Sequence, residues 1–370
     1  MKAWPVLGIV FIEAVLFAAH WFVYRTFVIF AGNLGPCATL ALRDVLFVLA
    51  FSFIVAALLS FRFANAPVAL LYKIAAVWLG MLNFFFLAAC LCWPLNAALL
   101  LAGLPPRRPL IAAILFSLAV LVSIYGILNA RWIRVRRVPI CLPNLPPSWR
   151  GRTALLFSDL HLGNINSLGF IRRIASMAAG LNPDIVLIPG DLFDGTPVDA
   201  DRLAAPLSQL APPFGIYFSA GNHDEFGSSA AYYTPALIRA GVRVLANEKV
   251  VADGLQIVGI PYHDSTYPMR MKATLESLRL DPACASILLN HVPNRLPIAE
   301  QAGVSLQLSG HTHGGQLFPF TWLVRRAFGK FTYGLHNFGA LQVYTSSGAG
   351  TWGPPMRVGT HPEIVLLQFE

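Results

Sequence analysis

The 370-residue sequence contains few charged residues: 12% are Asp, Glu, Lys or Arg, whereas 56% are hydrophobic. A soluble domain carries roughly 25% charged residues, so we expect a large part of this chain to lie in lipid. The apolar excess is concentrated before about residue 130, and Asp, His and Asn gather after it. This division and the chain length predict two domains.

Cysteine pairs and nucleic-acid motifs are also missing. The five cysteines are scattered and form no CxxC pair, which argues against a disulfide framework and a zinc ribbon and fits reduced thiols. The net charge of +9 indicates an anionic partner. Because no aromatic-basic nucleic-acid motif accompanies this charge, we expect lipid headgroups or a phosphorylated substrate, and no nucleic acid.

Residues 1–130 are predicted to form a transmembrane helical domain of about four spans, because each span needs about 20 mostly apolar residues. The candidate spans are Trp4–Phe30, Val45–Phe61, Val68–Trp93 and Leu110–Ala130. The first lacks a small-residue cleavage site and is too long for a simple signal peptide. Pro94 is expected to end the third span, and a fifth, short or re-entrant segment at Leu95–Leu101 is an alternative.

Basic residues predict the orientation of these spans. Arg131, Arg134, Arg136 and Arg137 follow the fourth span directly. By the positive-inside rule they place the second domain in the cytoplasm, so we expect an integral membrane protein with a cytoplasmic second domain. Arg43, Arg107 and Arg108 then fall on the opposite side, against the rule.

The first span contains ionisable residues, which are functional candidates within a membrane by default. Glu13 and His20 are seven residues apart and therefore share one face of the helix. The simpler interpretation is an inter-helix hydrogen bond for this pair, with Arg25 extending its cation to the membrane surface.

Residues 131–151 are expected to form a basic and proline-rich linker, and the pattern changes after it. Short β-rich runs then alternate with amphipathic helical stretches, which predicts an α/β domain over residues 152–370, with sheets buried on both faces. The predicted strands are Thr153–Asp159, Asp184–Asp191, Gly215–Asp224, Leu255–Ile260, Ala285–His291, Ser305–His311, Leu341–Gly348 and Glu363–Phe369.

Polar residues of the metal-binding types stand at the ends of five predicted strands. They are Asp159, His161, Asp191, Asp194, Asn222, His223, His291, His311 and His313. The carboxyl ends of strands are where α/β folds build their sites. A single histidine beside a strand is more often a hydrogen-bonding bystander, but five strand ends of this composition together predict a metal site.

Five short blocks at these positions resemble those of the calcineurin-like metallophosphoesterases. They are DLH (Asp159–His161), GDLFD (Gly190–Asp194), GNHDE (Gly221–Glu225), NH (Asn290–His291) and GHTH (Gly310–His313). The stretches GHTHGGQ, YGLH and VGTHPEIVLLQF resemble the membrane-associated bacterial branch, whose members are similar to the UDP-2,3-diacylglucosamine pyrophosphatases of lipid A synthesis. The resemblance implies two mixed β-sheets sandwiched by helices, in four layers ordered α/β/β/α.

The resemblance also implies two divalent metal ions. The first would be held by Asp159, His161, Asp191 and His313, and the second by Asn222, His291 and His311, with Asp191 shared. One carboxylate can hold two cations about 3.5–4 Å apart, as in-line displacement at phosphorus requires. Ligands of these types suit Mn, which we expect first, or Fe, Zn or Co. The nucleophile would be a water activated by both ions.

His223 is implied to be catalytic, by stabilising the developing charge on phosphate oxygen or by protonating the leaving alkoxide. Asp194 would hold the His223 imidazole oriented and charged; the alternative is that Asp194 caps a helix. Asp224 stands where many family members carry Glu and is not a ligand in this scheme.

Three further features are candidates for contact with substrate or membrane. His263 and His336 could line a substrate pocket, although lone histidines more often only form hydrogen bonds. The stretch from Gly314 to His336 is apolar, aromatic and basic. Such a segment is typical of a membrane-interfacial element, and an aromatic lid packed on the domain is equally consistent with it.

Taken together, these patterns predict a membrane-anchored, metal-dependent phosphoric ester hydrolase that cleaves phosphodiester or pyrophosphate bonds. A lipid-linked substrate such as UDP-2,3-diacylglucosamine is one possibility, and a soluble or protein substrate with the helices only as an anchor is another. A non-catalytic receptor or assembly protein is disfavoured by the intact ligand set, and a transporter is a minor alternative. The sequence does not predict the oligomeric state.

Overall fold

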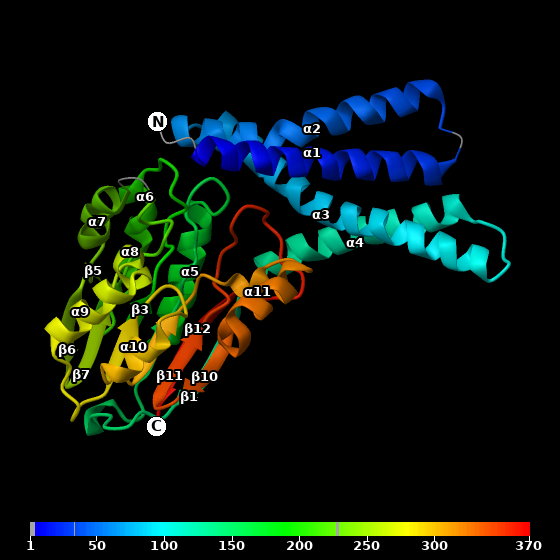
Figure 1. The fold of residues 1–370 in the computed structure, drawn as a ribbon. Helices are drawn as coiled ribbons and strands as arrows, with labels where there is room; N and C mark the ends of the chain where they lie inside the picture. Colours follow the sequence, from blue (N-terminus) through cyan, green and yellow to red (C-terminus); the bar gives the residue numbers. More distant parts are fainter. Residues whose placement is uncertain (1–3, 33, 227–228) are drawn as a thin grey trace. The chain divides into compact units, whose positions relative to one another are not determined.

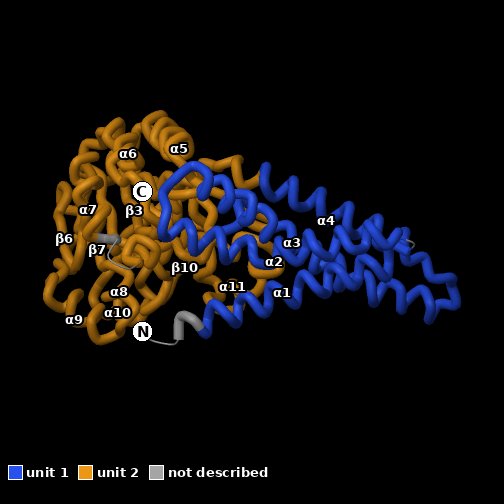
Figure 2. The backbone as a smooth tube through the Cα atoms, turned by 90° about the horizontal axis from the view of Figure 1, so that it is seen from above, with its two compact units in different colours: residues 1–128, 353–356 blue, residues 129–352, 357–370 orange. Residues whose placement is uncertain are grey.

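The computed structural model describes residues 4–32, 34–226 and 229–370. The chain divides into two compact units (Figure 2). Unit 1 comprises Met1–Leu128 and the short segment Gly353–Met356, and unit 2 comprises Asn129–Trp352 and Arg357–Glu370.

The helices of unit 1 are α1 (Trp4–Ala31), α2 (Pro36–Arg62), α3 (Ala66–Leu101) and α4 (Arg108–Arg131). All four are long and apolar enough to cross a membrane, which confirms the predicted number of spans. The expectation that Pro94 ends the third span is wrong, because α3 continues through Pro94 to Leu101. Membrane helices tolerate proline where neighbours satisfy the freed backbone groups, and Leu95–Leu101 is therefore part of α3 and not a separate segment.

His20 of α1 forms an inter-helix hydrogen bond, as the simpler interpretation of the sequence predicts. Its Nε2 accepts from Trp78 Nε1 of α3 at 2.8 Å, and its Nδ1 lies 2.7 Å from the carbonyl oxygen of Leu16. The carboxylate oxygens of Glu13 have no hydrogen-bond partner among the described residues. The predicted inter-helix hydrogen bond therefore forms for His20, which is a structural hydrogen-bonding residue, and not for Glu13.

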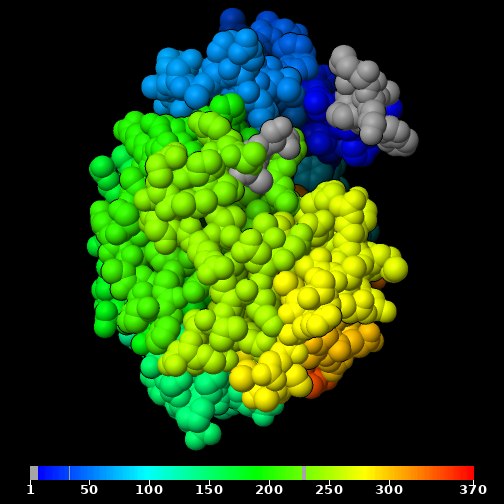
Figure 3. Space-filling view, turned by 90° about the vertical axis from the view of Figure 1, so that its left-hand side faces the viewer, coloured from blue at the N-terminus to red at the C-terminus, as the bar shows by residue number. Residues whose placement is uncertain are grey.

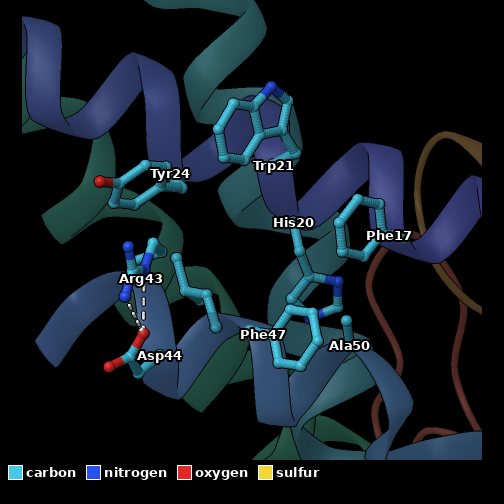
Figure 4. Close-up of a pocket in the computed structure, with 9 residues that line it drawn as sticks. Phe17, His20, Trp21, Tyr24, Arg43, Asp44, Phe47 and Ala50 are labelled. Atoms are coloured by element: carbon cyan, nitrogen blue, oxygen red, sulfur yellow. Dashed lines mark hydrogen bonds and ion pairs between the residues drawn. The ribbon is translucent and has the colours of Figure 1, made fainter. Parts of the chain in front are cut away.

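A cavity of about 320 Å³ borders His20 in unit 1. Figure 4 shows its lining by side chains of α1 and α2, most of them aromatic. The polar end is formed by Arg43 and Asp44, whose Nη2 and Oδ1 atoms are 2.8 Å apart.

Unit 2 contains two six-stranded mixed sheets (Figure 1). The first sheet has the order β1 (Arg134–Ile140), β12 (Glu363–Phe369), β2 (Thr153–Leu156), β3 (Ile185–Ile188), β4 (Ile216–Phe218) and β5 (Val242–Val244). The second has the order β10 (Gly334–Phe338), β11 (Leu341–Thr345), β9 (Leu306–Ser309), β8 (Ser286–Leu289), β7 (Leu255–Gly259) and β6 (Glu248–Ala252). The predicted pair of mixed sheets is therefore confirmed.

Helices cover the outer faces of the two sheets. Those on the first sheet are α5 (Leu168–Leu181), α6 (Ala200–Ala204) and α7 (Ser229–Arg239). The second sheet carries α9 (Pro268–Leu278) and α10 (Leu296–Gln301), and the short α8 (Tyr262–Thr266) directly precedes α9. Seen from the side of α7 and β6, the surface of this unit is made by the green and yellow part of the chain (Figure 3).

Alternation along the strands builds three apolar layers, because successive side chains of a strand point to opposite faces. In β3, Val186 and Ile188 pack under α5 to α7, whereas Ile185 and Leu187 face the second sheet. Ile287 of β8 completes the layer between the sheets. The fully apolar predicted strands thus reflect burial on both faces.

The stretch 131–151 differs from the expected linker. Its residues 134–140 form β1, which pairs in parallel with β12, and Trp149 is fully buried between the sheets, where its Nε1 donates to the carbonyl oxygen of Ala252 at 2.9 Å. In β1, Arg136 and Arg137 are exposed and Arg134 is partly buried, whereas Val138 and Ile140 are buried. Only Trp132 and Ile133 separate α4 from the sheet.

Candidate active site

The predicted ligands follow neighbouring parallel strands. In the first sheet, β2, β3 and β4 are parallel neighbours, and Asp159, Asp191 and Asn222 follow them in turn. In the second sheet, β8 and β9 are parallel neighbours, and they are followed by His291 and His311. Loops at the same end of parallel strands meet, so the topology collects these side chains.

Six of the seven predicted ligands fall into two groups whose candidate ligand atoms lie within 4.8 Å of one another. One group is Asp159, His161 and His313, and the other is Asp191, His291 and His311. The seventh, Asn222, joins the second group, because its Oδ1 is 3.0 Å from His311 Nδ1. His161 and Asp191 also lie within the same distance of His223.

The distances within the groups fit two adjacent cations. His161 Nε2 is 3.0 Å from His313 Nε2, which is 3.5 Å from Asp159 Oδ1. Asp191 Oδ2 is 3.8 Å from His161 Nε2 and 3.1 Å from His291 Nε2. Ligand atoms about 2.1 Å from one cation lie about 3 Å or slightly more from each other. Asp191 Oδ2 faces both groups, which is the position that a shared ligand needs.

Unsatisfied polar atoms support the same interpretation. His291 is fully buried, and its Nδ1 lies 2.9 Å from the carbonyl oxygen of Pro189, to which it donates. This bond orients the ring so that Nε2 faces Asp191 Oδ2 at 3.1 Å as an ion pair, while Nε2 forms no hydrogen bond of good geometry with the described residues. A buried nitrogen of this kind is costly unless it is bound, so the residues present fit a metal ion.

Backbone strain is concentrated at the same positions. Asp159, His161, Asp191, His311 and His313 all have positive φ, between 46° and 68°. Non-glycine residues rarely adopt this conformation, and such residues cluster at functional sites. The strain turns each side chain from its strand end toward the common centre.

Asp224 supports the site without belonging to either group. Its Oδ2 accepts from the backbone N–H groups of Asp191 at 2.6 Å and Gly221 at 2.9 Å, and its Oδ1 accepts from that of Phe193 at 2.9 Å. The residue is 1% exposed. Asp224 therefore ties the loop after β4 to the loop after β3.

Burial and opposite charge set the proton affinities of the central residues. Burial opposes ionisation of Asp191, but the attraction of the His291 imidazolium outweighs it, and the pKa of Asp191 is lowered. Conversely, burial alone would lower the pKa of His291, but the attraction of the Asp191 carboxylate outweighs burial and raises this pKa to about 9. Burial, assisted by the neighbouring Arg357 charge, holds the pKa of His313 well below its usual value. His313 is therefore neutral, which is the form that binds metal.

The predicted partnership of Asp194 and His223 differs in one respect. His223 Nδ1 lies 3.1 Å from the backbone carbonyl oxygen of Asp194. The Asp194 carboxylate instead accepts from Thr196 N at 2.9 Å, Thr196 Oγ1 at 2.5 Å and Asn164 N at 3.2 Å. The carboxylate is used locally because a short acidic side chain readily bonds the backbone two residues on. His223 is oriented by the main chain of Asp194, and the expected pairing of the two side chains does not form.

Arg357 is a buried part of this region that sequence reasoning missed. It is 0% exposed, and its Nη2 donates to the carbonyl oxygens of Gly350 at 2.6 Å and Ser347 at 2.7 Å. The same atom lies 3.3 Å from His313 Nδ1. Gly350 in turn donates its N–H to the carbonyl oxygen of Asp159 at 2.9 Å. The signal was a glycine-rich run after β11 followed by a lone arginine, which carries no metal-binding residue type.

The two weaker histidine candidates lie outside both groups. His263 Nδ1 accepts from Arg270 Nη1 at 2.8 Å, and the side chain is 58% exposed. His336 Nε2 lies 3.1 Å from the carbonyl oxygen of Tyr333. Both are engaged in local hydrogen bonds, as lone histidines usually are.

Comparison with known proteins agrees with this geometry. Residues 153–315 match the family described as calcineurin-like phosphoesterase. The chain is 30% identical to an uncharacterised metallophosphoesterase of Campylobacter jejuni over 70% of its own length and 71% of the relative. It is 32% identical to an uncharacterised metallophosphoesterase of Aquifex aeolicus, over 68% of this chain and 98% of that one. It is also 32% identical to a transmembrane protein with metallophosphoesterase domain of Danio rerio, over 70% of this chain but only 62% of the relative.

None of these names mentions lipid A synthesis, so the finer resemblance to UDP-2,3-diacylglucosamine pyrophosphatases is not shown. The family and the site together make the chain a hydrolase of phosphoric esters with membrane-spanning helices and a metal-binding site. The protein belongs to the calcineurin-like metallophosphoesterases.

Proposed function

We propose that this protein is a membrane-anchored dinuclear phosphoesterase whose substrate carries its phosphodiester or pyrophosphate on a membrane lipid. The observation that carries the proposal is the position of Asp191 Oδ2, within 3.8 Å of His161 Nε2 and 3.1 Å of His291 Nε2. A single carboxylate facing two groups of ligands is what a pair of ions requires.

The metal-binding roles follow the two groups. Asp159, His161, Asp191 and His313 would hold one ion, and Asn222, His291, His311 and Asp191 the other. When bound, the ions supply Lewis-acid polarisation of the phosphate and activation of a water at neutral pH. Histidine, carboxylate and amide donors favour Mn, with Fe, Zn or Co as alternatives.

His223 is the side chain that would bind the phosphate and protonate the leaving group. His223 is half-buried beside the cluster, with its ring centroid 4.8 Å from that of His161. Because Nδ1 donates to the carbonyl oxygen of Asp194, Nε2 carries the function. In the protonated form it donates to a phosphate oxygen and delivers a proton to the leaving alkoxide.

Trp352 supplies a surface for the leaving group. Its side chain is 56% exposed, and its ring centroid is 5.7 Å from that of His223. Gln316 holds the Trp352 backbone from both sides: Oε1 accepts from Trp352 N and Nε2 donates to Trp352 O, each at 3.0 Å. These bonds hold the backbone of Trp352, and its exposed indole next to the general acid favours an apolar or planar leaving group.

We also propose that the catalytic domain is cytoplasmic and that the membrane is a bacterial inner membrane. Arg131 is the last residue of α4, and Arg134 and Arg137 follow within six residues; these cations support this orientation by the positive-inside rule. The same cations would attract anionic headgroups.

The test measures hydrolysis of UDP-2,3-diacylglucosamine and of a generic aryl phosphodiester by the detergent-purified full-length protein with Mn. The Asp191→Ala variant is the negative control. The matched neutral control is Asp253→Ala, which removes an exposed carboxylate that pairs with Arg152. Turnover of both substrates that Asp191→Ala abolishes and Asp253→Ala retains supports the proposal. Cleavage of the aryl ester alone removes the lipid A substrate, and turnover that survives Asp191→Ala contradicts the dinuclear site.

A further inference from the structure

Helix α11 (Phe320–Phe328) has a strongly exposed apolar side. None of its nine residues is buried. Phe320, Trp322 and Leu323 are 49%, 61% and 48% exposed, and Phe318, two residues before the helix, is 52% exposed. We call these four residues the α11 surface. Contiguous exposed apolar groups of this size mark an interaction surface.

Cations border the α11 surface. Arg325 and Arg326 lie in the last turn of the helix and are exposed. The ion pairs among the described residues include neither of them. Aromatic rings beside unpaired arginines are typical of a helix that lies in the headgroup layer, where rings enter the acyl boundary and cations meet phosphate.

Contacts within unit 2 connect α11 to the point at which the chain leaves the fourth span. Asn129, in the last turn of α4, donates through Nδ2 to the carbonyl oxygen of Thr360 at 2.9 Å. Thr360 Oγ1 donates to the carbonyl oxygen of Gln316 at 3.2 Å, just before α11. After α11, Tyr333 Oη accepts from Arg136 Nη1 of β1 at 2.5 Å. The chain before α11 is therefore linked through Thr360 to the last turn of α4, and the chain after α11 bonds directly to β1.

We propose that α11 is an interfacial helix that seats the α11 surface in the headgroup layer of an anionic phospholipid bilayer. Seating of this kind is independent of the reaction. Its consequence for catalysis rests on the proposed function: a lipid-borne phosphate would reach the metal site without leaving the membrane surface.

Direct contacts join this helix to the metal ligands. The ring centroid of Phe328 is 6.2 Å from that of His311. Thr312, between the ligands His311 and His313, donates through Oγ1 to the carbonyl oxygen of Thr332 at 2.7 Å, four residues after the helix. The residues that would contact the bilayer and the residues that would bind the reacting phosphate thus lie on neighbouring parts of one loop.

The first experiment uses the full-length protein in vesicles of phosphatidylcholine and phosphatidylglycerol with brominated acyl chains. The fluorescence of Trp322 is obtained as the difference between the wild type and Trp322→Phe. The control is Val251→Trp, which places an indole at a 62% exposed position on the edge strand β6. Its fluorescence is obtained as the difference between this variant and the wild type.

We expect bromine to quench at least about half of the Trp322 signal, since interfacial side chains enter the acyl boundary. The fluorescence of the indole introduced on β6 should remain nearly unchanged. Equal quenching of the two signals overturns the proposal, and α11 is then a lid or a protein contact.

The second experiment compares substrates. Arg325→Gln with Arg326→Gln should raise KM for a phosphodiester lipid in anionic vesicles by about tenfold or more, since each basic residue near such a surface adds to attraction. KM for a soluble aryl phosphodiester should not change. Arg239→Gln, which removes an exposed arginine on α7, is the matched control. An equal loss on both substrates, or no loss on either, contradicts the membrane role. If the wild type cleaves neither ester, the proposed function fails while the quenching experiment still decides the role of α11.

Discussion

Replacement of Arg357 by methionine tests whether the second layer of this site is organised by one buried guanidinium. Methionine has a similar length and no donors, so the carbonyl oxygens of Gly350 and Ser347 lose bonds of 2.6 and 2.7 Å. A hydrogen bond to a charged group contributes about 1.5–3 kcal/mol, which gives about 3–6 kcal/mol for the two. The guanidinium no longer has to be desolvated, and this offset of a few kcal/mol leaves a net loss of about 2–4 kcal/mol.

The assay is thermal unfolding of the full-length protein in detergent, together with turnover of an aryl phosphodiester. A loss of about 2–4 kcal/mol lowers Tm by about 5–15 °C in a domain of this size. Turnover should fall as well, because the loop held by Arg357 bonds to the backbone of Asp159 through Gly350. Arg357→Lys keeps the charge and one donor group, and it should fall between the wild type and Arg357→Met.

The matched control is Arg239→Met, which removes an exposed arginine paired with Asp201. Surface pairs contribute about 0–1 kcal/mol, so its Tm should remain close to that of the wild type. If Arg357→Met melts and turns over like Arg239→Met, the buried arginine does not organise the loop and the reasoning is refuted.

Three further outcomes follow from the geometry. Gly350→Ala should abolish most turnover, because a Cβ there would lie 2.6 Å from the carbonyl oxygen of Asp159. The control is Gly180→Ala in α5, whose Cβ meets open space and which should be neutral or slightly stabilising. Equal activity of the two variants would contradict this prediction. Metal affinity should rise with pH up to about 9, because the metal must displace the proton that Asp191 holds on His291. Calorimetry in buffers of different ionisation enthalpy measures the proton released on binding. A metal affinity that does not change from about pH 7 to 9 would argue against this prediction. Asp224→Asn should lower Tm by several degrees, because an amide nitrogen cannot accept from a backbone N–H. An unchanged Tm would show that the Asp224 bonds between the loops after β3 and β4 do not contribute to stability.

Much of the architecture was predictable because it depends on local pattern. Four long apolar helices and a following α/β domain are visible in composition and in the alternation of short apolar runs, since burial on both faces makes a strand apolar throughout. The candidate ligands were predictable because their residue types stand within a few residues of strand ends. The end of the third span was not predictable, because a proline ends a helix only where no neighbouring group satisfies the carbonyl that it leaves free.

Amino-acid order is enough to tell which residue types can bind metal, where each stands relative to its strand, and how many segments can enter a membrane. These properties belong to single residues and short windows, so no tertiary information is needed to see them. Tertiary structure alone decided that His223 is oriented by the Asp194 carbonyl, that β1 joins the sheet, and that Arg357 lies beside His313. Each of these contacts joins segments that are distant in the chain and meet only after the sheets pack. A contact made by a backbone carbonyl cannot be predicted from the pattern of side chains, because every residue carries one.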